Sequence, residues 1–128
     1  MKPLHALTLA EALQEMREGR LAARDHAEAL VARIEASDAA IEAWACLDRD
    51  HVMREAARLD ALPAAARGPL HGASVGLKDI IHTTALPTRM GSPAYADFAP
   101  SRDAPCVRRL VDAGGYAFGK TVTTELAY

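Results

Sequence analysis

The sequence predicts an α/β protein, and three observations carry that prediction. Apolar residues recur with helical spacing through the first sixty positions, short apolar runs with Gly, Pro, Ser and Thr replace them from Gly68, and helix and strand patterns then alternate. The chain has 128 residues, which is one domain at most. Only 5% of residues are aromatic while 50% are hydrophobic, so Ala, Leu and Val must supply most of the core.

Two helices are expected first. The first begins at a capping box, with Thr8 followed three residues later by Glu11, and it ends near Gly19. The second covers about residues 24–36 and has no good N-cap, because alanines occupy the preceding positions. The apolar stripes of the two helices are formed by Leu9, Leu13 and Met16, and by Ala27, Leu30, Val31 and Ile34.

A buried strand and a third helix follow. Residues 43–47 are a short apolar run around Trp44, which is typical of a buried strand. Asp48 or Asp50 can cap the next helix, which carries Val52, Ala56 and Leu59 and ends at Pro63. The first half therefore predicts three helices and one strand.

The second half begins with a predicted strand over 73–79 that enters a loop, followed by an aperiodic segment over 86–101. A fourth helix is expected to be capped by Asp103, with Pro105 in its first turn and a glycine pair at 114–115 as its end. Its apolar face contains Val107, Leu110 and Val111. A short strand over 116–118 comes after it.

Charge and composition exclude several classes of function. The 15 basic and 17 acidic side chains give a net charge of −2 without a basic cluster, so neither nucleic acid nor an anionic membrane surface is an expected partner. No apolar run is long enough for a membrane span, and the N-terminus lacks a signal peptide, so a cytoplasmic location is expected.

Cysteine and histidine spacing argues against a metal site. Cys46 and Cys106 stand alone in apolar sequence and are expected to be reduced and buried. The five histidines have no ligand spacing, and His26 and His51 are expected on solvated helix faces. No metal site is therefore predicted.

Lys78 is the first candidate catalytic residue. On a strand, Ser74, Gly76 and Lys78 share one face, while Leu77 and Asp79 lie on the other. Two interpretations stay open from the residues alone: a strand-end lysine that reaches solvent, or a buried, neutral lysine that acts as a general base. Ser74 cannot be its nucleophile, because four strand residues span about 13 Å.

Residues 114–121 match the letter of the phosphate-loop pattern, G-x-x-x-x-G-K-[ST]. A true phosphate loop follows a strand and leads into a helix, whereas here a predicted helix precedes Gly114 and the segment contains Tyr, Ala and Phe. A nucleotide-binding module is therefore kept only as a lesser alternative. A helix, a glycine cap and a strand is the favoured interpretation.

Five blocks occur in a distinctive order: 68–72, 75–80, 91–93, 103–115 and 119–127. Together they resemble the amidase signature family. The resemblance implies that residues 1–128 are the N-terminal portion of an amidase signature domain, with N-terminal helices and an incomplete part of its mixed β-sheet. The chain departs from the family pattern at Ala73-Ser74, where an Ile-Pro pair is usual, and at His82, where many members have Asp.

The resemblance also implies a chemistry. The family cleaves or transfers carboxylic amides with a serine nucleophile, a second serine in a cis peptide, and a lysine, and Lys78 matches that lysine. The resemblance implies that this chemistry needs no metal and no organic cofactor. Both serines of the family pattern lie downstream of Tyr128, so the 128-residue chain is expected to be inactive by itself. Lys120 matches a family position that is not the catalytic one, and a structural role is expected for it, with pocket lining as the lesser option.

Two functions are compatible with this resemblance. The first is an amide hydrolase (amidase) that acts on carbon–nitrogen bonds, and the alternative is the A subunit of a tRNA-dependent amidotransferase. The expected partners are a small amide substrate and either further copies of the chain or partner subunits, without direct contact to nucleic acid.

Overall fold

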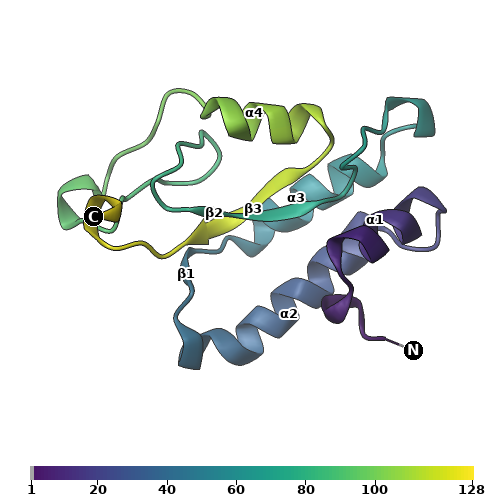
Figure 1. The fold of residues 1–128 in the computed structure, drawn as a ribbon, viewed down its shortest axis with the longest axis horizontal. Coiled ribbons are helices and arrows are strands. Elements are labelled where there is room, and N and C mark those ends of the chain that lie inside the picture. Colours follow the sequence, from purple (N-terminus) through teal and green to yellow (C-terminus); the bar gives the residue numbers. More distant parts are fainter. Residues whose placement is uncertain (1) are drawn as a thin grey trace.

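A computed structural model describes residues 2–128 and confirms the α/β class. A small sheet lies between α4 on one side and the N-terminal helices on the other (Figure 1). The main elements are α1 (Leu9–Arg17), α2 (Ala23–Ile41), β1 (Trp44–Cys46), α3 (Arg49–Asp60), β2 (Ser74–Lys78), α4 (Pro105–Asp112) and β3 (Tyr116–Thr121). Short 3-10 turns occur at Leu4–Ala6, Ala64–Ala66, Pro93–Tyr95 and Glu125–Ala127. No helix within residues 2–128 is long and apolar enough to cross a membrane.

The sheet is mixed and has β3 at its centre. Its order is β1-β3-β2, with β1 antiparallel and β2 parallel to β3. Val75 pairs with Ala117 but Gly76 pairs with Gly119, so Phe118 is an extra residue in β3. A bulge of this kind reverses the alternation of side chains along the strand. Residues beyond Phe118 therefore change faces relative to those before it.

Each face of the sheet has its own core. The larger core joins one sheet face to α1, α2 and α3 and includes Val31, Val52, Leu59, Tyr116 and Phe118. The smaller core lies beneath α4 on the other face and consists of Leu77, Leu86, Val107 and Ala117. Burial of each large apolar side chain contributes about 1.5–3 kcal/mol, so these two clusters fix the positions of β2 and β3.

The predicted helix starts are confirmed for α1 and α3. Thr8 accepts a hydrogen bond from the backbone N–H of Glu11, whose carboxylate accepts one from the N–H of Thr8 at 2.6 Å. Asp48 caps α3 by accepting from the N–H of His51 at 3.0 Å. The second helix lacks a side-chain cap, as predicted, but it continues to Ile41, five residues beyond the predicted end.

The predicted cap of the fourth helix is wrong. Ala104 is the N-cap residue of α4 and provides no side-chain hydrogen bond. Asp103 lies one position too early, and its carboxylate accepts from the N–H and the hydroxyl of Thr84 at 2.7 and 3.0 Å. Asp103 therefore fixes the loop after β2 instead of the helix.

The expected environments of four other side chains are also wrong. His26 and His51 are each only 7% exposed, because they lie on the inner sides of α2 and α3. His51 Nε2 donates to the carbonyl of Ala117 at 2.8 Å, whereas neither ring nitrogen of His26 has a partner within residues 2–128. Cys106 is exposed in the first turn of α4 and Cys46 is only half-buried, so neither is the buried thiol that was expected; both are free cysteines.

Candidate active site around Lys78

Lys78 is the last residue of β2 and lies on the exposed side of the strand end. Leu77 and Asp79 are 7% and 3% exposed, whereas Gly76 and Lys78 are exposed. The predicted alternation over these four residues is confirmed. Within residues 2–128, Lys78 thus has the geometry of a strand-end lysine whose amine reaches solvent.

An apolar hollow lies on the sheet face from which Lys78 projects. Its volume is about 240 Å³, and it is formed by side chains of α2, β1 and β3 together with Ser74 and Gly76 of β2. Leu30, Ile34, Trp44 and Phe118 supply its walls. Gly76 precedes Lys78 by two strand residues, or about 7 Å, so the hollow adjoins the lysine along the strand.

Asp79 faces the other side of β2 and contacts a buried lysine there. Lys120 is 0% exposed, and its Nζ lies 3.2 Å from Asp79 Oδ1. The same amine donates to the hydroxyl of Thr88 at 2.8 Å and to the carbonyl of Pro87 at 3.1 Å. The bulge at Phe118 turns Lys120 towards this face, so the pair lies across the sheet from Lys78.

The burial of Lys120 removes the nucleotide-binding alternative. Gly119 and Lys120 lie inside β3, which extends to Thr121, three residues beyond the predicted strand. Burial lowers the pKa of Lys120, and this effect outweighs the attraction of Asp79. All three donor directions of the amine are used by protein acceptors, so no phosphate can be held there. The expected structural role of Lys120 is confirmed.

The loop after β2 is tied to its own start by the Asp79 backbone and side chain. The N–H of Arg89 lies 3.3 Å from both carboxylate oxygens of Asp79, and the N–H of Met90 donates to the carbonyl of Asp79 at 2.9 Å. The hydroxyl of Thr88 also lies 3.4 Å from the carbonyl of Ile81. Residues 79–90 therefore form a closed loop beside Lys78.

The C-terminal segment packs against the end of this loop. Gly91 has φ +66°, and a Cβ there would lie 2.7 Å from the carbonyl oxygen of Thr123. Ser92 donates to the carboxylate of Glu125 at 2.7 Å, and the N–H of Leu126 donates to the carbonyl of Met90. Figure 1 shows the resulting proximity of the C-terminus and the Pro93–Tyr95 turn.

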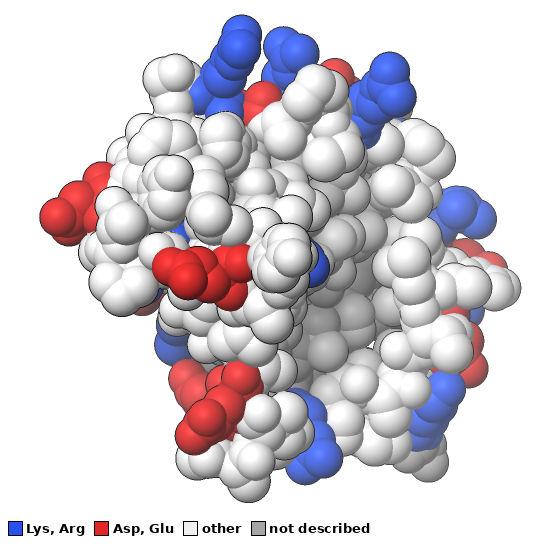
Figure 2. Space-filling view, turned by 60° about the vertical axis from the view of Figure 1, so that its left-hand side comes forward, with Lys and Arg blue, Asp and Glu red and all other residues white. Residues whose placement is uncertain are grey.

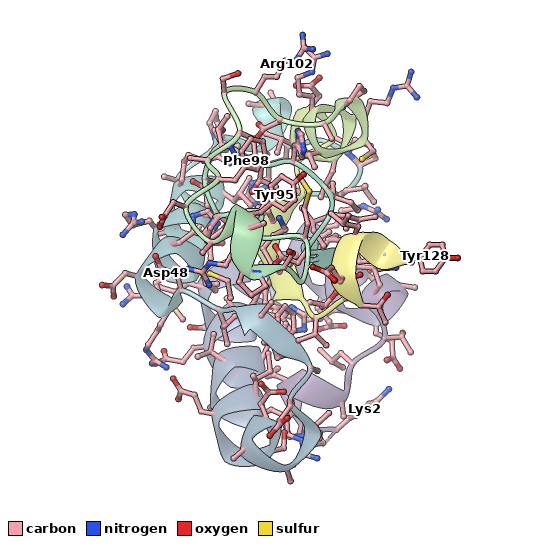
Figure 3. The ribbon with its side chains drawn as sticks, turned by 90° about the vertical axis from the view of Figure 1, so that its left-hand side faces the viewer. Lys2, Asp48, Tyr95, Phe98, Arg102 and Tyr128 are labelled. Carbon is pink, nitrogen blue, oxygen red and sulfur yellow. The ribbon has the colours of Figure 1, made fainter. Side chains whose placement is uncertain are left out.

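Two aromatic residues near the C-terminal segment pack together, and a third does not. In Figure 3, Tyr95 and Phe98 lie together, with ring centroids 6.1 Å apart, while Tyr128 points away from the rest of the chain. Ser92 is 8% exposed and its hydroxyl donates to the carboxylate of Glu125, so this serine joins two segments of the fold and is closed to a substrate.

Within residues 2–128, no three His, Cys, Asp or Glu side chains are grouped to hold a metal ion. Figure 2 shows charges of both signs interspersed on the face it presents, without an extended basic surface.

The sequence predicted that Lys78 lies at a strand end and that Asp79 lies on the opposite face of the strand. It did not show that Asp79 meets Lys120, because that contact depends on the register of β2 and β3.

Comparisons with known proteins identify the family of this chain. Residues 25–128 match the family model described as Amidase. The chain is 36% identical over 127 residues to an acylamidase of Rhodococcus erythropolis, covering 98% of this chain and 27% of that protein. It is also 36% identical over 127 residues to the A subunit of a glutamyl-tRNA(Gln) amidotransferase of Nitratidesulfovibrio vulgaris, covering 99% of this chain and 26% of that protein.

A solved structure agrees with the sequence relatives. The peptide amidase of Stenotrophomonas maltophilia superimposes with a TM-score of 0.86 at 36% identity, covering 96% of this chain and 26% of that one. The chain thus spans about a quarter of the length of the relatives it matches. With the family model matching four-fifths of its residues, the chain belongs to the amidase signature family.

Proposed function

We propose that this chain is the lysine-bearing portion of an amidase signature domain and that Lys78 is the general base of amide hydrolysis. The supporting observation is the arrangement at the end of β2, where Lys78 projects from one face and its neighbour Asp79 is bound by Lys120 on the other. The two serines of the family pattern would come from sequence outside residues 1–128.

The proposed reaction requires a lysine amine that can accept a proton. Neutral Lys78 would take the proton of the nucleophilic serine through the bridging serine as the serine oxygen bonds to the amide carbonyl carbon. The proton then passes to the departing amine or ammonia as the C–N bond breaks. Water attacks the acyl-enzyme in the same way and releases the carboxylic acid, so the lysine ends the cycle neutral.

The ion pair on the opposite face supports this role for Lys78. A carboxylate that contacted the Lys78 amine would favour its protonated form and disable the base. Asp79 is the carboxylate adjacent in sequence, and Lys120 holds it at 3.2 Å on the far side of the strand. The exposure of Lys78 within residues 2–128 means that the required exclusion of water must come from further sequence or from substrate.

A chimaera tests the proposal on this chain's own residues. Residues 1–128 would replace the matching segment of the Rhodococcus erythropolis acylamidase, to which they are 36% identical over 127 aligned residues. The chimaera should release amine from a simple amide that the parent enzyme cleaves, and Lys78→Ala should lower kcat by about 10²–10⁴-fold.

The chain contains a matched control for this experiment. It has three lysines, Lys2, Lys78 and Lys120, and Lys2 is exposed and remote in sequence from the proposed site. Lys2→Ala should leave kcat unchanged. A chimaera that folds, as judged by a cooperative melt, but cleaves no amide would contradict the proposal, as would full activity of the Lys78→Ala form.

The A subunit of a tRNA-dependent amidotransferase is the second candidate function. It is supported by the 36% identity to the amidotransferase chain of Nitratidesulfovibrio vulgaris, which equals the identity to the acylamidase. A partner protein that co-purifies with the native protein would favour this candidate, and hydrolysis of simple amides by the isolated native protein would favour the first. The cytoplasmic location expected from the sequence stays a prediction that cell fractionation can test.

A further inference from the structure

A second cavity lies near the opposite end of β2 from Lys78. It has a volume of about 330 Å³ and opens between the last turn of α1 and the loop before β2. Leu13, Ala64 and Pro69 form its apolar wall, and Arg17, Arg67 and His71 supply its polar groups. Within the described part of the chain no Asp or Glu lines it, although the whole chain has a net charge of −2.

Arg17 has a free guanidinium group at this cavity. Its acidic neighbours are occupied elsewhere, since Arg20 binds both Glu15 and Glu18. Within residues 2–128, Arg17 makes no side-chain hydrogen bond or ion pair that would compete with a ligand. An unpaired guanidinium presents a planar set of donors that matches a carboxylate.

Arg67 is held in place by the backbone. Its Nε donates to the carbonyl of Leu62 at 3.1 Å and one terminal nitrogen lies 3.4 Å from the carbonyl of Asp60. The carboxylate of Asp60 accepts instead from the N–H groups of Ala23 and Arg24, at 2.8 and 3.0 Å. Arg67 therefore keeps its charge and its remaining donors available next to a fixed loop.

His71 is the buried polar residue of the cavity. It is 7% exposed, and its Nδ1 has no hydrogen-bond partner within residues 2–128. Burial and the charge of Arg67 lower the pKa of His71, and they outweigh the Asp60 carboxylate, which raises it, so the neutral imidazole is favoured. The cavity thus combines two cationic groups, a neutral ring and an apolar wall.

From this arrangement we infer that the cavity between α1 and the 64–71 loop binds a small carboxylate with an apolar body. The carboxylate lies between the guanidinium groups of Arg17 and Arg67, and the apolar body contacts Leu13 and Pro69. The volume is at the small end of the range for small-molecule sites, which suits a ligand of about one ring. The inference does not depend on Lys78 or on amide hydrolysis.

Benzoate is the probe for this site, with benzamide as its uncharged counterpart. Titration of the ¹⁵N-labelled native protein should give saturable amide shifts at Leu13, Ala64 and Gly68, with a Kd on the order of 1 mM. Benzamide should give no saturable shifts there. Inorganic phosphate should bind at least tenfold more weakly than benzoate, because it has no apolar body to bury.

Arg17→Gln is the decisive variant because an exposed, unpaired side chain can be changed without disturbing the fold. It should weaken benzoate binding about tenfold or more, as expected for loss of a charged hydrogen-bond partner. Arg33→Gln, at an exposed position of α2 away from the cavity, should leave the affinity unchanged. Absence of saturable shifts, equal binding of benzamide or phosphate, or unchanged affinity in Arg17→Gln would overturn the inference.

Discussion

Replacing Lys120 by methionine tests the buried ion pair of the sheet. The amine of Lys120 has three partners, Asp79 at 3.2 Å, Thr88 at 2.8 Å and Pro87 at 3.1 Å, and its side chain is 0% exposed. Methionine keeps most of the side-chain volume but removes the charge. Within residues 2–128, Asp79, 3% exposed, would then be a buried carboxylate whose remaining hydrogen-bond donor is the N–H of Arg89.

The expected loss follows from that uncompensated charge. Removing one member of a buried ion pair costs about 3–5 kcal/mol, whereas removing both members costs far less. A domain has about 5–15 kcal/mol of stability in total, so Lys120→Met should remove a large part of it. The double variant Asp79→Asn/Lys120→Met should be more stable than Lys120→Met alone by roughly 2 kcal/mol or more.

Urea denaturation of the 128-residue chain, followed by circular dichroism, measures these differences. The parent, both single variants and the double variant form a double-mutant cycle, which isolates the coupling between the two side chains. The reasoning would be refuted if Lys120→Met lost less than about 1 kcal/mol, or if the losses of the two single variants simply added in the double variant.

Two further predictions concern buried positions. His26→Leu should stabilise the chain by about 1 kcal/mol, because it removes two buried ring nitrogens that lack partners. Burial lowers the pKa of His26 from 6.5, so the unfolded chain binds the extra proton and stability is lost as the pH falls below 6.5; thermal melts should show the advantage of the variant growing from pH 7 to pH 5. Gly91→Ala should cost about 1–3 kcal/mol, because a Cβ would lie 2.7 Å from a backbone oxygen of Thr123 at φ +66°. Gly19→Ala is its matched control, since Gly19 has φ +71° with no atom within 4 Å, and an equal loss in both variants would show that the close contact at Gly91 is unimportant.

The sequence predicted helix starts well where the structure depends on contacts between residues that are close in sequence. The capping box at Thr8 and Glu11 and the cap at Asp48 are examples, because each depends on a hydrogen bond that spans three residues. The predicted cap at Asp103 was wrong because the helix begins one residue later than the pattern suggested. The carboxylate of Asp103 instead accepts hydrogen bonds from Thr84, which is distant in sequence.

Contacts that depend on the register between strands could not be predicted from the sequence. The bulge at Phe118 aims Lys120 at Asp79, and nothing in either local pattern predicts which residues of β2 and β3 face each other. The burial of His26 and His51 depended likewise on which side of each helix packs inward. The strand pattern made Lys78 a candidate and left two interpretations open, and the resemblance to a local family motif over 75–80 then matched it to the catalytic lysine.

The most direct test of the central claim compares two arginine substitutions in the acylamidase chimaera. Arginine keeps the positive charge and length of a lysine but stays protonated at any working pH, so it cannot act as a base. If Lys78 is the base, Lys78→Arg should lower kcat/KM at least 100-fold while Lys2→Arg leaves it unchanged. Near-normal kcat/KM for the Lys78→Arg form would contradict the assignment of Lys78 as the general base. Lys78 would then be a strand-end lysine that reaches solvent and takes no part in catalysis.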